Sequence, residues 1–470
     1  MGLSGDSARH LILRDVHNPL YNLMMYPWIR VFGDSEIAIR IPSLCAALVL
    51  IWLVWRWVVP RFGARAGALA AAMMAVSPVA VWYSTEAKNN IFTVLFTTLG
   101  VMTLDSAIRS RSFRDTAIAT LFVVLAFATD AQSLLVLVPV GVLVTWMSLR
   151  DARAGALSWG RSDAGVLRRA GPVLICAIVA AAAITPWVIY KAGHASELSR
   201  RYVGYFDWHE PIRLLVLWFP TGGAIPPIGP EHPRGWFGDR EGWVIRALLV
   251  APFVLPPMIR GVRALKASPS GVVTLGAILW PVLLMHVISE ALVLSGSAVR
   301  LYQPRNLLVI LPWFCILVGA GLAAIPPGPL RLARTLAPIV LSLCCTVAIR
   351  TFRADAVTVN TPNPDWRGAL RWIEAQDGPS RLPVASNSMV QPIWYYSPGR
   401  DAMMLPGRSG LATELETLSS GPGFGEFWYI HNPHWGFRVP PEELRAVLER
   451  YRTLDARTFR SLQVFRLSRE

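Results

Sequence analysis

The chain is poor in charged residues and has almost no lysine. Charged residues make up 16% of its 470 residues, whereas a soluble domain carries about 25%. Only Lys88, Lys191 and Lys266 are lysines. The five cysteines lie in apolar runs without a CxxC spacing or a histidine partner. We therefore expect neither disulfides nor a cysteine metal site, and the low charge argues against an ordinary soluble protein.

Several common functional signatures are also missing. The sequence contains no P-loop, no nucleophile elbow and no HExxH zinc motif. No apolar segment follows the start, so residues 1–40 do not form a signal peptide. A net charge of +15 would suggest nucleic acid in a soluble protein. Here the arginines lie in short loops between apolar runs, as topology signals do, so we expect no nucleic-acid partner.

Long apolar runs dominate what is present. The segment 307–325 is almost unbroken and is long enough to cross about 30 Å of hydrocarbon. The pattern predicts a membrane all-α protein, a polytopic bundle of about ten transmembrane helices. The predicted spans are 41–59, 66–83, 90–108, 116–129, 132–148, 172–190, 243–259, 271–295, 306–325 and 335–350.

The loops between these spans separate by charge. The short loops of one set carry only Lys88, Arg300 and Arg305. By the positive-inside rule the strongly basic set lies in the cytoplasm, which places both termini outside a multi-pass protein of the bacterial inner membrane. The strongly basic set holds Arg56, Arg61, Arg65, Arg109, Arg111, Arg114, Arg150, Arg153, Arg161, Arg168, Arg169, Arg260, Arg263, Lys266, Arg331 and Arg334.

The segments expected outside divide the chain into two parts. Residues 1–350 form the transmembrane module, with external loops at 1–40 and 191–242. Apolar residues at helical spacing between Leu20 and Val31 predict an interfacial helix in the first loop. From 351 to 470 the hydropathy falls, and alternating strand and helix patterns predict a small external α/β domain.

Several motifs follow one another along most of the chain. They read "RDVHNPLY", "FGDSEIAIRIPS", "SPVAVWYSTEAKNN", "YQPRNLLVILP" and "NPDWRGALRWI". In this order they resemble segments of GT-C glycosyltransferases, especially bacterial relatives of protein O-mannosyltransferases and of the lipid A aminoarabinose transferase. The resemblance implies a GT-C membrane fold and transfer of a sugar from a polyprenyl-phosphate-linked donor. The acceptor would be a lipid, a glycan or a protein on the outer face of the membrane.

The chain departs from that family at its start. Family members usually begin with one more transmembrane helix, followed by an acidic pair in the first external loop. This sequence begins inside that loop, so either its start codon has been placed too late or the first transmembrane helix is missing. An inactive or accessory relative of the family is therefore an alternative to an enzyme.

The expected chemistry selects four candidate residues. Displacing a lipid phosphate from a sugar requires a base for the acceptor proton and cations for the leaving phosphate. Asp15 and Glu86 are the candidate catalytic carboxylates, and Lys88 and Arg305 are the candidate phosphate ligands. Each has an ordinary structural alternative, since Asp15 suits a turn, Glu86 a helix start, Lys88 a snorkelling position and Arg305 an interfacial anchor.

Four further residues are candidates for substrate binding: His17, Tyr21, Asp130 and Glu290. His17 and Tyr21 belong to the "HNPLY" segment, and Asp130 interrupts two apolar runs at their predicted outer end. Glu290 lies four residues after His286 on the eighth span. Intramembrane charge is costly and suggests function, although a His–Glu packing pair is an equal alternative. The sequence specifies no cofactor and leaves a divalent metal ion open.

A lipid or glycan transporter is a second alternative. Transporters commonly have interrupted helices with charged groups at the middle of the membrane. In this chain the candidate groups fall at the predicted outer ends of the spans. The positions of the charges therefore favour a transferase acting at the outer surface.

The charge distribution makes a testable prediction about topology. Single cysteines introduced at Ser199 and Ser409 should react with a membrane-impermeant thiol reagent in intact cells. A cysteine at Ser162 should react only after the cells are permeabilised, because its loop is predicted to be cytoplasmic. Labelling of Ser162 alone in intact cells would reverse the predicted orientation.

Overall fold

We describe the fold from a computed structural model of the chain. Two compact units make up the chain: residues 1–225 with 236–349, and residues 226–235 with 350–470. The structure describes residues 19–110, 112–159, 178–186, 189, 212–221, 242–295, 304–351, 365–377, 381–388, 391–397, 399–405, 410–419, 425–432, 439–459 and 462–468.

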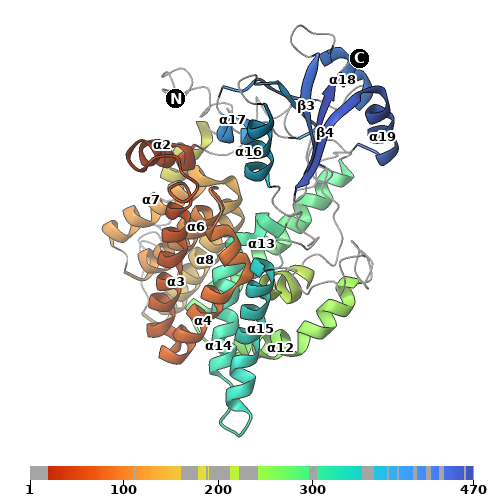
Figure 1. Ribbon diagram of the computed structural model, residues 1–470. Coiled ribbons are helices and arrows are strands. Elements are labelled where there is room, and N and C mark those ends of the chain that lie inside the picture. The colour runs from red at the N-terminus through yellow and green to blue at the C-terminus, as the bar shows by residue number, and fades with distance from the viewer. Residues whose placement is uncertain are drawn as a thin grey trace. The chain divides into compact units, whose positions relative to one another are not determined.

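The first unit is helical (Figure 1). Every predicted span except 172–190 falls on described helices, and most of 172–190 lies outside the described residues. The described elements of this unit are α2 (Leu20–Phe32), α3 (Ile41–Phe62), α4 (Ala64–Val76), α5 (Pro78–Ser84), α6 (Asn90–Ser110), α7 (Phe113–Thr129), η1 (Ala131–Ser133), α8 (Leu134–Trp159), η3 (Arg213–Trp218), α11 (Phe219–Thr221), α12 (Gly242–Leu265), α13 (Pro269–Leu294), η4 (Pro304–Ile310), α14 (Leu311–Ala323) and α15 (Arg331–Thr351).

Helix α14 lies at the centre of this bundle. Every residue from Leu311 to Leu322 is buried, and α14 packs against α4 and α12. Trp313 is fully buried and meets Trp57 of α3 edge to face, with ring centroids 5.6 Å apart. A helix that is apolar all round is expected at the core of a membrane bundle.

Glycines let α12 and α14 approach closely. A Cβ at Gly321 would lie 1.7 Å from the backbone oxygen of Pro257, and one at Gly261 would lie 2.1 Å from that of Leu317. No side chain could occupy either position without moving backbone. Small residues at helix crossings give close packing where the hydrophobic effect between helices is weak.

The second predicted span is a broken helix. Helices α4 and α5 meet at Ser77 with a bend of 59°. Pro78 begins α5, and the Ser77 hydroxyl oxygen accepts a hydrogen bond from the Ala80 amide at 3.4 Å. Proline at the first position and serine at the cap both favour a new helix start. The bend directs α5 into the turn that carries Glu86 and Lys88.

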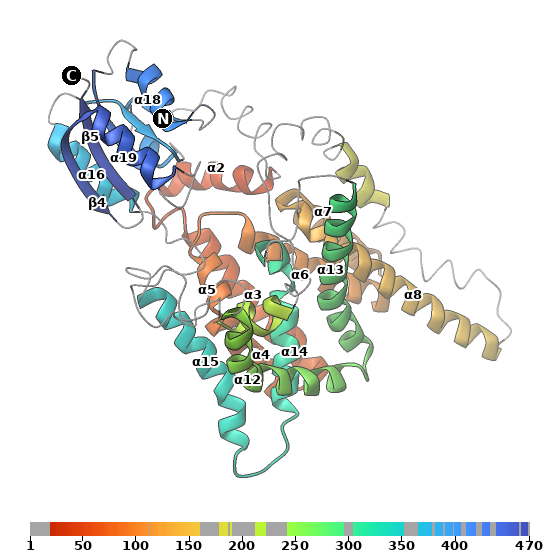
Figure 2. The ribbon, with the colours of Figure 1, turned by 90° about the vertical axis from the view of Figure 1, so that its right-hand side faces the viewer.

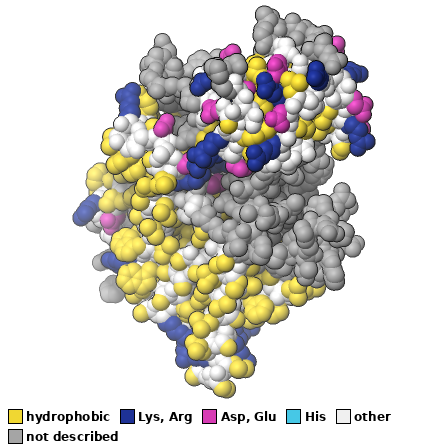
Figure 3. Space-filling view, viewed as in Figure 1, with side chains coloured by type: hydrophobic (Ala, Val, Ile, Leu, Met, Phe, Trp, Pro, Cys, Tyr) yellow, Lys and Arg dark blue, Asp and Glu magenta, His cyan; other side chains and the backbone are white. Residues whose placement is uncertain are grey.

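Five described helices are long and apolar enough to cross a membrane, or six if the bent pair is one span. Figure 3 shows hydrophobic side chains over the displayed face of the helical unit and basic side chains near its lower tip. The single-span candidates are Ile41–Phe62, Asn90–Ala107, Ala247–Leu265, Pro269–Ala291 and Asn306–Ala323. The chain is a multi-pass membrane protein, and the count of ten spans remains a prediction.

Helix α2 lies crosswise at one end of the helical unit (Figure 2). Its side chains Leu23, Val31 and Phe32 are 51%, 73% and 57% exposed. Gly33 ends the helix with a φ of 78°, which favours glycine. A helix therefore forms where an interfacial helix was predicted. Its exposed apolar side chains would suit the headgroup region, and its position at the membrane surface remains a prediction.

The second unit contains a five-stranded sheet of order β2-β1-β3-β5-β4. Strand β1 pairs in parallel with β2 and β3, whereas β5 pairs antiparallel with β3 and β4. The strands are β1 (Val384–Ser386), β2 (Ala402–Met404), β3 (Glu426–His431), β4 (Arg452–Phe459) and β5 (Leu462–Ser468). The helices are α16 (Trp366–Asp377), α17 (Gln391–Tyr396), α18 (Leu411–Ser419) and α19 (Pro441–Arg450).

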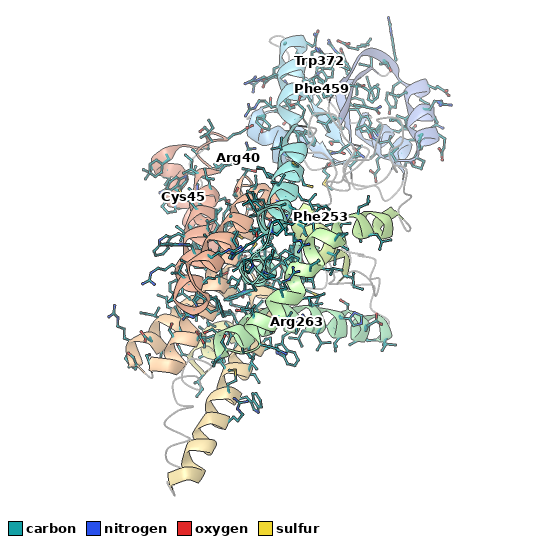
Figure 4. All side chains as sticks on the ribbon, turned by 90° about the horizontal axis from the view of Figure 1, so that it is seen from below. Arg40, Cys45, Phe253, Arg263, Trp372 and Phe459 are labelled. Atoms are coloured by element: carbon teal, nitrogen blue, oxygen red, sulfur yellow. The ribbon has the colours of Figure 1, made fainter. Side chains whose placement is uncertain are left out.

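Helices cover both faces of this sheet. Trp428 and Ile430 of β3 pack with residues of α16 and α17, whereas Phe427 and Tyr429 pack with residues of α18 and α19. Alternate residues of a strand point to opposite faces, so β3 supplies both cores. On the α16 side, Figure 4 shows Trp372 beside Phe459, with ring centroids 5.8 Å apart. The predicted fold class, a helical membrane bundle with a small α/β domain, is confirmed.

A buried ion pair ties α16 to the loop before β2. One guanidinium nitrogen of Arg400 lies 2.5 Å from Asp377 Oδ2, and both side chains are 1% exposed. Trp428 Nε1 donates to the other oxygen of Asp377 at 2.6 Å, and Arg400 also donates to the Leu382 carbonyl at 2.8 Å. The pair therefore links helix, loop and central strand.

Breaking this pair should destabilise the C-terminal unit. Arg400→Ala leaves Asp377 buried without its cation, which typically costs about 3–5 kcal/mol. We expect faster proteolysis of residues 365–468 in the full-length protein and a lower unfolding midpoint. Arg371→Ala, an exposed site on α16, is the matched control and should change little. An unchanged Arg400→Ala variant would contradict a structural role for the pair.

Candidate active site

The turn between α5 and α6 carries two of the predicted site residues, Glu86 and Lys88. The Glu86 carboxylate accepts a hydrogen bond from Trp82 Nε1 at 2.8 Å, and its other oxygen is 3.9 Å from Lys88 Nζ. The Glu86 side chain is 15% exposed, whereas that of Lys88 is 60% exposed. Trp82 thus fixes the carboxylate, while the ammonium group of Lys88 is held loosely beside it and can reach a ligand.

Asp130 occupies the break between α7 and α8. Its Oδ1 accepts a hydrogen bond from the backbone N–H of Gln132 at 2.9 Å and so caps η1. Its Oδ2 accepts from Asn89 Nδ2 at 3.2 Å, and the same amide donates to the Thr129 carbonyl at 3.2 Å. Asn89 directly follows Lys88, so these bonds hold the Glu86–Lys88 turn against the α7–α8 break.

A hydrogen bond between two amide side chains connects η4 to the α7–α8 break. Gln132 Nε2 donates to Asn306 Oδ1 at 2.8 Å across 174 residues of sequence. Asn306 follows Arg305 in η4, and η4 contacts both α6 and η1. The structure describes the backbone of Arg305 but not its side chain. The backbone segments that carry Lys88, Asp130 and Arg305 therefore meet at one end of the bundle.

Tyr21 contributes from α2. Its ring lies 5.8 Å from that of Phe92, in the first turn of α6. Burial raises the pKa of the Tyr21 hydroxyl well above its ordinary value, so this group is neutral and able to donate a hydrogen bond. Helix α2 thus lies beside the same end of α6 as the Glu86–Lys88 turn.

Of the remaining predicted residues, one lies on a helix that contacts η4, and two lie outside the residues that the structure describes. Glu290 is half-buried on α13, and α13 also contacts η4. Asp15 and His17 lie outside the described residues. Among the described residues no group of three or more His, Cys, Asp or Glu could hold a metal ion. The roles of all eight predicted residues remain predictions.

Sequence reasoning missed three neutral residues that hold this end together: Asn89, Gln132 and Asn306. Each stands next to or near a residue that was selected for its charge. A polar amide at the end of an apolar run would have been the available signal, because such a group needs a partner there. Trp82, the donor to Glu86, was also missed.

The described residues provide an exposed cation (Lys88), a carboxylate bonded to an indole (Glu86), and a second carboxylate in a network of amides (Asp130). Lys88 can donate to a phosphate oxygen, and charge-assisted bonds of this kind are strong. Glu86 can accept a proton, or a hydrogen bond from a sugar hydroxyl. The site can therefore hold a phosphate and a polyol side by side.

Known proteins resemble the chain in sequence over part of its length. The family model described as dolichyl-phosphate-mannose-protein mannosyltransferase matches residues 16–190. This region includes Glu86, Lys88 and Asp130. A search of curated proteins gave no match.

Solved structures resemble the chain over nearly its whole length. ArnT from Cupriavidus metallidurans in the apo state is 13% identical, with a TM-score of 0.56 over 96% of this chain and 87% of ArnT. The same protein bound to undecaprenyl phosphate is 14% identical, with a TM-score of 0.52 and the same coverage. The chain has the GT-C fold. The resemblance to GT-C glycosyltransferases seen in the motifs is thereby confirmed.

The Gln132–Asn306 bond makes a prediction about stability of this GT-C bundle. Gln132→Met or Asn306→Leu removes one partner of this half-buried bond, at a cost of about 1 kcal/mol. The double variant replaces both amides by apolar groups and should be more stable than either single variant. The melting temperature in detergent measures this, with exposed Gln376→Met as control. Additive losses would contradict a direct bond.

Proposed function

We propose that the chain is a membrane glycosyltransferase. It transfers a sugar from a polyprenyl-phosphate-linked donor to a lipid, glycan or protein acceptor on the outer face of the membrane. The observation that carries this proposal is the convergence of the Glu86–Lys88 turn, Asp130 and η4 at one end of a GT-C bundle.

The leaving phosphate explains why the site needs cations. As the bond from the anomeric carbon to the phosphate oxygen breaks, negative charge grows on that phosphate. Lys88 is 60% exposed and only loosely paired with Glu86, so its ammonium group can turn to the phosphate. Arg305 follows Pro304 at the start of η4 and is proposed to bind the same phosphate. Two cations offset the charge where lipid lowers the local dielectric.

The acceptor hydroxyl must lose a proton during transfer. Asp15 is proposed as the base, and Glu86 as a second carboxylate that orients the sugar or accepts the proton. Glu86 is the better defined of the two, because Trp82 holds one of its oxygens. Asp130, Tyr21, His17 and Glu290 are proposed to contact the substrate from α7–η1, α2, the segment before α2 and α13.

Two kinds of similarity support a polyprenyl phosphate as the donor carrier. The description of the matching family model names dolichyl-phosphate-mannose, and one of the similar ArnT structures contains bound undecaprenyl phosphate. In this chain the exposed apolar residues of α2 lie on the helix that contacts α6 through Tyr21. They offer a surface for an isoprenoid chain next to the proposed phosphate position.

Two alternative functions can be distinguished from a glycosyltransferase by experiment. An inactive or accessory relative would bind the donor lipid without turning it over. A transporter would move a lipid or glycan without cleaving a bond. Release of free polyprenyl phosphate from a labelled donor, together with a glycosylated acceptor, distinguishes the transferase from both.

Removing either proposed cation should weaken donor binding. Lys88→Ala and Arg305→Ala should each lower the affinity for a polyprenyl-phosphate sugar by about tenfold or more, since a hydrogen bond to a charged group contributes about 1.5–3 kcal/mol. Asp15→Asn should keep the affinity and lower turnover by about 10²–10⁴-fold. Equilibrium binding and single-turnover transfer with purified full-length protein measure the two effects.

Matched controls are available elsewhere in the chain. Lys266→Ala and Arg263→Ala remove exposed cations at the far end of α12, where Figure 4 labels Arg263. These variants should bind and turn over the donor normally. A fully active Asp15→Asn would remove Asp15 from the catalytic role, and normal donor affinity in both Lys88→Ala and Arg305→Ala would refute the shared phosphate site.

A further inference from the structure

Two arginines come together at the end of the helical unit opposite to the candidate active site. Arg65 is the second residue of α4 and Arg331 is the first residue of α15. Helix α3 ends at Phe62 just before α4, and α14 runs from η4 at the site end to the turn before α15. Figure 1 shows the α14–α15 connection at the lower tip of this unit. This end is therefore remote from Lys88 and Asp130.

Thr335 joins the two arginines. One terminal nitrogen of Arg65 donates to Thr335 Oγ1 at 3.4 Å, and that hydroxyl donates to the Arg331 carbonyl at 2.8 Å. Thr335 is 6% exposed. The Arg65 guanidinium is thus held against the first turn of α15, beside the Arg331 backbone.

Each arginine keeps a buried donor that no described atom accepts. These donors are Nη1 of Arg65 and Nε of Arg331. Arg61, from the same α3–α4 region, is satisfied differently: it donates to the Trp57 carbonyl at 3.1 Å and pairs with Asp105 at 3.4 Å. A buried N–H without an acceptor is costly, and a buried charged one more so. The two donors therefore indicate a place for an anion.

An apolar stripe starts at the same point. Leu332, Leu336, Val340 and Leu343 of α15 are 70%, 43%, 50% and 46% exposed. Their spacing of four, four and three residues puts them on one face of the helix. Leu336 directly follows Thr335, so the stripe leads away from the two arginines along the length of α15.

We propose that Arg65 and Arg331 bind the phosphate of an anionic phospholipid, with an acyl chain along the Leu332–Leu343 stripe. Guanidinium donors match phosphate oxygens in geometry and charge, and two helix starts add favourable backbone dipoles. Basic sites between transmembrane helices are known settings for lipid headgroups. The positive-inside rule accounts for cations at this end, but it does not account for buried, unsatisfied donors beside an exposed apolar stripe.

The test compares lipid binding by delipidated full-length protein. We expect phosphatidylglycerol to bind more tightly than phosphatidylcholine in detergent, as counted by native mass spectrometry. The double variant Arg65→Met with Arg331→Met should lose about tenfold or more in affinity for phosphatidylglycerol. The control removes equal charge from exposed arginines at the same end, Arg56→Met with Arg334→Met, and should lose less than about twofold.

Several results would overturn the proposal. Equal losses in the two double variants would mean that diffuse charge, not this pair, attracts the lipid. Inorganic phosphate that displaced phosphatidylglycerol at similar concentrations would indicate a site for a free anion. Should the double variant fail to fold, the wild-type comparison still decides: phosphatidylglycerol bound no better than phosphatidylcholine would contradict the site.

Discussion

Interrupted helices in a membrane protein must satisfy their backbone groups without help from bulk water, and this constraint shapes the candidate site. The chain interrupts its helices at Ser77–Pro78 and at Asp130. Ser77 caps the first break, and Asp130 caps the second while accepting from Asn89. The Gln132–Asn306 bond then ties the second break to η4. The groups that stabilise the breaks also bring the candidate residues together.

The sequence predicts well those structural elements that leave a strong pattern of apolar residues, and predicts the others poorly. Apolar runs located the spans well, since 41–59 became α3 over Ile41–Phe62 and 90–108 became α6 over Asn90–Ser110. The predicted single span 66–83 did not reveal the 59° bend, because Pro78 lies in an otherwise apolar run. Strand β4 carries little signal in the sequence, because it is an edge strand with mostly exposed residues and so lacks an apolar alternation.

The site was predicted in part for a similar reason. Charge at the end of an apolar run selected Glu86, Lys88 and Asp130, and the structure connects their segments. The neutral amides Asn89, Gln132 and Asn306 carry no comparable signal, because their importance depends on partners far away in the sequence. Motif resemblance selected Asp15 and His17, which lie outside the described residues and stay predictions.

The two ends of the helical unit use cations differently. At the candidate site Lys88 is exposed and loosely paired with Glu86, which suits a ligand that binds and leaves. At the opposite end Arg65 is fixed by Thr335 with a buried donor, which suits a ligand that stays. One GT-C bundle would thus separate a substrate phosphate from a structural lipid phosphate.

The Glu86–Lys88 turn and η4 are proposed to bind one donor phosphate together. A cryo-electron microscopy structure of the full-length protein with a bound polyprenyl phosphate tests this proposal most directly. We expect the phosphorus atom within about 6 Å of both the Lys88 ammonium group and the Arg305 guanidinium group. A phosphate bound more than roughly 16 Å from Lys88, about two Debye lengths at physiological salt, would contradict it.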